Sequence, residues 1–152
     1  MLLASCSSES AQNDLFQGET FSSQQEAIDD FVAKEKLKGH IIMAQTNKDE
    51  QLLIAEYNRN EYIIGELLEE EGKYKAITIS GVTSLRGGIG MGWEFTSTAK
   101  NEYSIQFHKE ENLASSVHVP ERTFYFNVGN GHTLKTSPTV TSDAIVSAKT
   151  IK

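Results

Sequence analysis

Residues 40–58 read HIIMAQTNKDEQLLIAEYN, and this stretch decides the fold class. Two apolar runs, 41–44 and 52–55, flank the polar residues 47–50, so the pattern predicts two strands joined by a turn. Further strand-like runs continue toward the C terminus at 61–70, 74–82, 93–98, 103–110, 122–128, 132–136 and within 143–151. Because short connections favour antiparallel pairing of sequence neighbours, we expect a meander.

Two further turns are predicted from their residue types. Glu71, Gly72 and Lys73 lie between two strand-like runs and indicate a hairpin. Asn130-Gly131 lies between the runs 122–128 and 132–136 and is the strongest two-residue hairpin signal in the chain. From His40 onward the sequence therefore predicts strands and turns and no strong helix.

Before residue 40 the periodicity is helical, and residues 23–38 predict one helix. Ser23 and Glu26 match a capping box, in which the serine oxygen accepts an amide N–H and the glutamate reaches back. Gly39 is expected to take the left-handed cap. Four apolar residues share one face of this helix at helical spacing and would pack on the sheet: Ala27, Ile28, Phe31 and Val32.

The predicted fold class is therefore α+β. We expect one N-terminal helix packed on a curled, mainly antiparallel meander sheet of about seven or eight strands. Sheets of this width tend to curl or to split, so a partly closed barrel or a sandwich are the alternatives for the sheet.

Composition narrows the functional classes. The chain has 152 residues and a formal net charge of −7, with 21 acidic against 14 basic residues and no basic cluster, so no nucleic-acid partner is expected. The single cysteine rules out an internal disulfide and a cluster of thiolate metal ligands. No apolar run approaches the roughly 20 residues needed to cross a bilayer.

The N-terminal residues Leu3-Ala4-Ser5-Cys6 combine an aliphatic residue, two small residues and the only cysteine. This motif resembles the lipobox of bacterial lipoproteins, where such a sequence ends a signal peptide. The resemblance implies that Cys6 receives a diacylglyceryl group and becomes the first residue of the mature protein, on the outer face of the cell membrane. The alternative is that Cys6 is an unmodified thiol in a polar tail.

The following residues predict how the domain is held. Residues 1–5 would be the remnant of the signal peptide, and the polar composition of residues 6–22 is typical of a flexible tether. Within this tether we expect Phe21 to pack against the folded part. Residues 23–152 would then form a single globular domain.

The glycine-rich stretch RGGIGMGW, residues 86–93, is the most distinctive motif in the middle of the sequence. A strand-like run follows it where a phosphate-binding loop needs a helix N-terminus, so a nucleotide site is not expected. The glycines fit a flexible connection between two strands, and they also fit an interaction loop. In the second case the exposed side chains are those of Arg86, Ile89, Met91 and Trp93.

No catalytic motif, metal site or cofactor site is predicted. The four histidines lie far apart in the sequence, without the spacing of metal ligands. The leading hypothesis is a lipid-anchored extracytoplasmic binding domain with no catalytic role, whose partner is an envelope protein, a peptide or a glycan. The alternative is an envelope hydrolase with acid and base residues from separate strands, for which Glu94, His108 and Glu110 form the only loose cluster.

Overall fold

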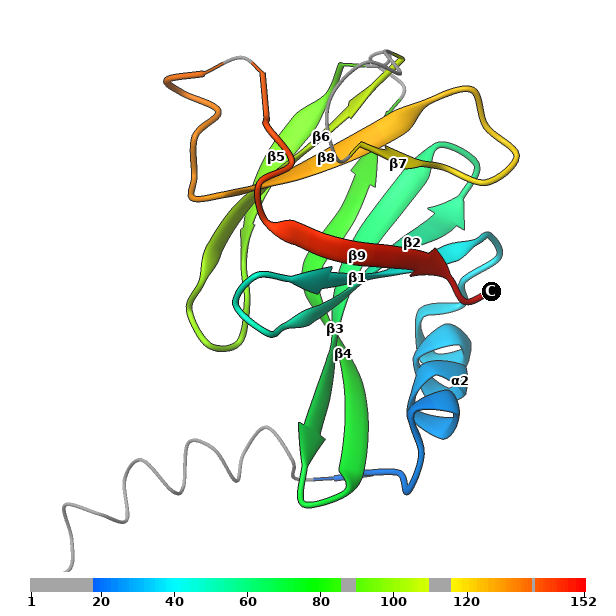
Figure 1. Cartoon of the computed structure of the whole chain (residues 1–152). Coiled ribbons are helices and arrows are strands. Elements are labelled where there is room, and N and C mark those ends of the chain that lie inside the picture. Colours follow the sequence, from blue (N-terminus) through cyan, green and yellow to red (C-terminus); the bar gives the residue numbers. More distant parts are fainter. Residues whose placement is uncertain (1–17, 86–89, 110–115, 138) are drawn as a thin grey trace, which may run out of the picture.

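The computed structural model describes residues 18–85, 90–109, 116–137 and 139–152 (Figure 1). One helix, α2 (Gln24–Glu35), precedes all the strands. Within the described residues nine strands follow: β1 (Ile41–Thr46), β2 (Gln51–Asn58), β3 (Glu61–Glu70), β4 (Lys73–Ser84), β5 (Gly92–Thr96), β6 (Glu102–His108), β7 (Val117–His118), β8 (Tyr125–Asn130) and β9 (Ile145–Thr150). None of the described helices is long and apolar enough to cross a membrane.

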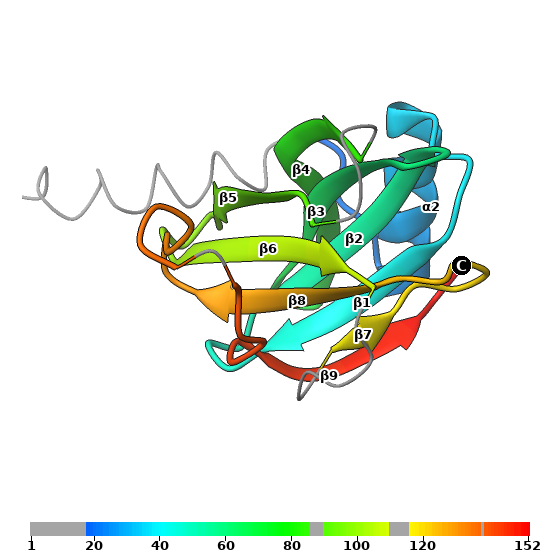
Figure 2. The ribbon, with the colours of Figure 1, turned by 90° about the horizontal axis from the view of Figure 1, so that it is seen from above.

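The strands form two antiparallel sheets. The first has the order β4-β3-β2-β1-β9 and the second the order β5-β6-β8-β7. Helix α2 lies against one face of the first sheet, and the second sheet lies against the opposite face of the first sheet (Figures 1 and 2). The predicted α+β class and the N-terminal helix on antiparallel strands are confirmed. The prediction of one curled meander is wrong, because the described strands divide between two sheets that are neither closed nor strongly curled.

The division into two sheets follows from strands that are apolar on both faces. Along β2, Leu52 and Ile54 point into the core shared by the two sheets. Leu53 and Ala55, which alternate with them, point into the core beneath the helix. A strand with two apolar faces needs a covering layer on each side, and one short helix covers only one of them. The second sheet supplies the other cover.

The helix begins as predicted and ends earlier. Ser23 is the N-cap, and its Oγ accepts the Glu26 N–H at 3.2 Å. The left-handed C-cap is Lys36, with φ 55°, so the prediction of a cap at Gly39 is wrong. Gly39 is needed for space instead, because a Cβ there would lie 2.3 Å from Glu56 Oε1.

The first two predicted turns are confirmed. Residues 47–50 join β1 to β2, and Glu71 and Gly72 join β3 to β4 with φ values of 53° and 77°. The N-terminal Phe21 packs as expected: it forms a bridge with Tyr74 of β4, with N–O distances of 2.9 and 2.8 Å.

The predicted hairpin at Asn130-Gly131 is wrong. Residues 132–136 form no strand, and β8 is paired by β6 and by the two-residue β7. Beyond β7 the backbone of β8 is bonded by a later segment: Val128 N–H donates to Ser142 Oγ at 3.1 Å, and Ala144 N–H donates to the Val128 carbonyl at 3.2 Å. The chain then enters the first sheet as β9, beside β1.

Candidate functional site

The predicted interaction loop is only partly within the described residues. Arg86 and Ile89 lie outside them, as does Cys6, the predicted lipidation site. Met91 is 39% exposed. Trp93 is partly buried against the core, stacks on Phe107 and donates its indole N–H to Ser80 Oγ at 3.0 Å. Trp93 therefore has a packing role that joins β5 to β4, and a binding role for the loop stays a prediction.

The residues of the alternative hydrolase hypothesis are not brought together. Glu94 pairs with Ser104 of β6, and its Oε2 accepts the Leu134 N–H at 3.2 Å. His108 lies four residues beyond Ser104 on β6, a distance of about 13 Å at the usual rise of a strand. Glu110 lies outside the described residues.

Each histidine has a local hydrogen-bonding contact. In the part of the chain that the structure describes, no three His, Cys, Asp or Glu side chains are grouped so that they could hold a metal ion. The contacts are those of His40 Nε2 with Glu121 Oε2 at 3.0 Å, His108 Nε2 with Ser116 Oγ at 3.4 Å, His118 Nε2 with the Arg122 carbonyl at 2.8 Å, and His132 Nε2 with the Phe95 carbonyl at 3.0 Å.

Two carboxyl groups are buried together at one end of the sheets, and sequence reasoning missed them. Glu50 is 7% exposed and Glu66 is 3% exposed, and both line a hollow of about 510 Å³. Glu50 Oε1 accepts hydrogen bonds from the Tyr103 hydroxyl and, at 3.1 Å, from Asn101 Nδ2. Glu66 Oε1 accepts the Thr98 N–H at 2.9 Å. The pair therefore connects the first sheet to residues of the second.

The environment of Glu66 favours its neutral form. Burial raises the pKa of this carboxyl group, the hydrogen bond from the Thr98 amide opposes that effect, and the charge of Glu50 raises the pKa further. Burial also raises the pKa of the Tyr103 hydroxyl, which keeps it a hydrogen-bond donor. We therefore expect the stability of this contact to depend on pH.

An ion pair joins the two sheets at another point. Arg122 Nη2 lies 2.9 Å from Glu56 Oε2, and the side chains of these residues are 23% and 7% exposed. The Tyr62 hydroxyl donates to the same carboxylate oxygen at 3.3 Å. Glu56 is on β2, and Arg122 lies in the connection between β7 and β8. The Glu56 carboxylate therefore has two side-chain partners that link β2 to β3 and to the β7–β8 connection.

The strand β9 forms an exposed edge of the first sheet. This strand ends the first sheet and pairs with β1 alone among the described strands. Five of its six residues are exposed, and Val146 is 67% exposed. Sequence reasoning predicted the strand but not that it would lie at an edge.

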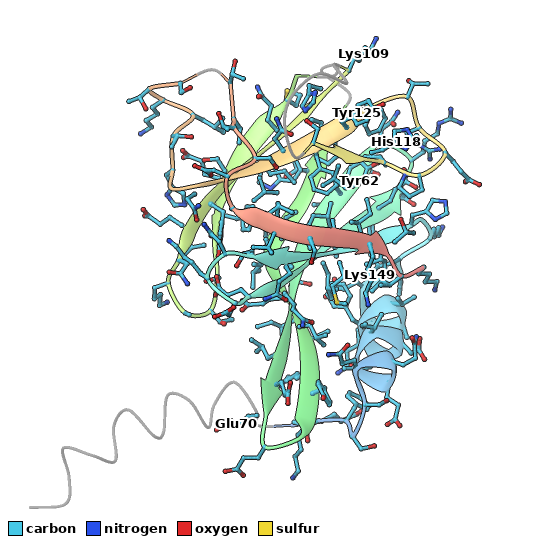
Figure 3. The ribbon with its side chains drawn as sticks, in the orientation of Figure 1. Tyr62, Glu70, Lys109, His118, Tyr125 and Lys149 are labelled. Atoms are coloured by element: carbon cyan, nitrogen blue, oxygen red, sulfur yellow. The ribbon has the colours of Figure 1, made fainter. Side chains whose placement is uncertain are left out.

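Hollows flank β9 on both sides. One, of about 350 Å³, lies between β9 and β7 and is lined by residues 116–118 and 145–148. The other, of about 230 Å³, is lined by residues 147–149 of β9 together with Met43, Gln45 and Gln51. Figure 3 labels His118 of β7, which lines the first hollow, and Lys149 of β9, which lines the second. Among the described strands, only β1 pairs with β9, and a hollow lies on each side of β9.

Comparisons with known proteins gave no match to a family model, to a curated protein or to a solved structure.

Proposed function

We propose that this chain is a lipid-anchored binding domain on the outer face of a bacterial membrane, and that it holds another envelope component at the β9 edge. The anchor is the lipid on Cys6, and the polar residues 6–22 give the domain reach above the lipid headgroups. The observation that carries the binding proposal is the exposed, hollow-flanked edge of β9. The separation of Glu94 from His108 gives no support to the alternative hydrolase.

The anchor is tested by expressing the chain in a bacterium behind a complete lipoprotein signal sequence. The wild type is expected in the membrane fraction, with a diacylglyceryl mass on its N-terminal peptide. The Cys6→Ser version should be unmodified and should leave that fraction. Two versions that are equally soluble and equally unmodified would refute the anchor.

Binding is tested in the same cells by photo-crosslinking from two matched exposed valines. Val146 of β9 is 67% exposed, and Val82 of β4 is 50% exposed. A photoreactive residue in place of Val146 is expected to give a discrete crosslinked product on intact cells. The same residue in place of Val82 is the control and should give none. Identical patterns from the two positions, or no product from either, would refute a binding role for β9.

A further inference from the structure

The hydrogen bonding of β1 decides which backbone groups of β9 are free. Thr46 N–H donates to the Glu50 carbonyl at 2.8 Å, and Glu56 N–H donates to the His40 carbonyl at 2.9 Å. Backbone groups alternate in direction along an antiparallel strand, so the even-numbered residues of β1 are bonded to β2. The odd-numbered residues of β1 are therefore bonded to β9.

The register carries this alternation across to β9. Ser147 and Lys149 lie opposite the odd-numbered residues 45 and 43, so they exchange hydrogen bonds with β1. Ala148 and Thr150 lie opposite the even-numbered residues 44 and 42. Their N–H and C=O groups consequently point away from the sheet, at the spacing that another extended backbone matches.

The other edge strands among the described residues have contacts along part of their length or are shorter than β9. Phe21 bridges the beginning of β4 through Tyr74. Further along β4, Ser80 accepts the indole N–H of Trp93 from β5, so these two edges meet. The edge strand β7 has only two residues. β9 combines five exposed residues with a hollow on each side.

The side chains around this edge indicate what the added strand would carry. Ala148 lies opposite Ala44, a residue of the core between the sheets, yet Ala148 is exposed beside the hollow that Val117 and Val146 also line. Lys149 is the only charged residue of β9, and none of the described residues that line the two flanking hollows is a carboxylate. In a chain of net charge −7, the described lining of this edge therefore offers a positive charge and no negative charge to an acidic segment.

We propose that β9 binds an extended polypeptide segment as an additional antiparallel strand, with an apolar side chain in the hollow between β9 and β7 and an acidic side chain beside Lys149. The inference rests on the proposed binding function and names the kind of partner. Main-chain hydrogen bonds supply the affinity in this mode of recognition, and the alternate side chains supply the specificity.

The test begins with the 152-residue chain and an unbiased displayed library of short peptides. Selected peptides are expected to contain an apolar and an acidic residue at alternating spacing. Their affinity is then measured by fluorescence anisotropy against the wild type, Ala148→Pro and the control variant Gly81→Ala, which lies on β4 with nothing within 4 Å of the added Cβ. Proline removes the outward N–H of Ala148 without touching the bonds to β1, and edge strands tolerate it in that position. We expect about a tenfold loss of affinity for Ala148→Pro and no change for Gly81→Ala.

A second readout leaves the protein unaltered. Single N-methyl groups are placed along a selected peptide, and binding should fall at every second position and persist at the positions between. Uniform tolerance of N-methylation would overturn strand addition, and so would a failure to select any peptide. If sedimentation detects a stable dimer that forms through β9, the edge binds a second copy of the chain, and the proposal of a peptide partner is overturned.

These outcomes separate the inference from the proposed function. Crosslinks from position 146 in cells, with no peptide selected, would leave a binding domain whose partner is not an extended strand. Peptides that bind in the alternating pattern, with no crosslink in cells, would leave the edge chemistry intact and refute the cellular role.

Discussion

Replacing Arg122 by methionine should destabilise the protein by leaving a buried carboxylate without its counter-ion. Glu56 is 7% exposed in its side chain and would retain the hydroxyl donor of Tyr62 as its other described side-chain partner. Breaking a fully buried ion pair costs about 3–5 kcal/mol. Because the Arg122 side chain is 23% exposed, water reaches part of this pair, and we expect a loss of about 2–3 kcal/mol.

The assay is urea unfolding followed by the fluorescence of Trp93, the only tryptophan of the chain, which stacks on the core residue Phe107. In a domain of this size the loss corresponds to a fall in melting temperature of about 5–10 °C. Arg59→Met is the matched control, since Arg59 is exposed, and it should change stability by less than about 0.5 kcal/mol. The double variant Glu56→Gln/Arg122→Met should recover part of the loss. Equal effects of the Arg122 and Arg59 variants would show that the ion pair between Glu56 and Arg122 does not stabilise the fold.

Three further predictions concern the same fold. Because the pKa of Glu66 is raised in the folded state, its contribution to the free energy of unfolding is fully present below the usual pKa of 4.5 and is lost as the pH rises through the folded-state pKa. The free energy of unfolding in urea should therefore fall between about pH 5 and about pH 7.5 by more in the wild type than in Glu66→Gln. Equal falls in the two proteins would contradict this prediction. Gly65→Ala should cost about 1–3 kcal/mol, because its Cβ would lie 2.6 Å from the Phe31 ring, whereas Gly81→Ala, with nothing within 4 Å, serves as the thermal-melt control. Ser23→Ala should cost about 1 kcal/mol by loss of the N-cap, and an unchanged melting curve would argue against that cap.

Local patterns in the sequence predicted local structure well. The helix start at Ser23, the turn at residues 47–50 and the hairpin at Glu71-Gly72 each depend on a few adjacent residues, and all three are confirmed. The core-facing alternation of β5 and β6 follows from the same kind of signal: Phe95, Tyr103, Ile105 and Phe107 are buried as the period of two requires.

Long-range pairing was beyond local reasoning. Among the described strands β1 is the first and β9 the last, and they pair. No residue pattern in either strand specifies the other as its partner. Asn130-Gly131 predicted a hairpin, but the side chain of Ser142 and the backbone of Ala144 bond to β8 in its place. Short-range turn chemistry gives way here to a contact between residues distant in sequence.

The buried carboxyl pair had a weak signal that could have been noticed. Glu66 interrupts the apolar run of residues 62–68, where a charged residue in a strand buried on both faces needs a partner. Its neighbour Glu50 is the last residue of the turn 47–50, where an exposed side chain is the ordinary expectation. Only the packing of the two sheets brings Tyr103 and Asn101 to it.

The most direct test of the account is amide hydrogen exchange along β9, residue by residue, in the free monomer and with a selected peptide. In the free protein the amides of Ser147 and Lys149 should be protected by β1, while those of Ala148 and Thr150 should exchange at nearly unprotected rates. Addition of the peptide should then protect Ala148 and Thr150. Equal protection of all four amides in the free monomer would show that the edge is already covered, and would contradict the account.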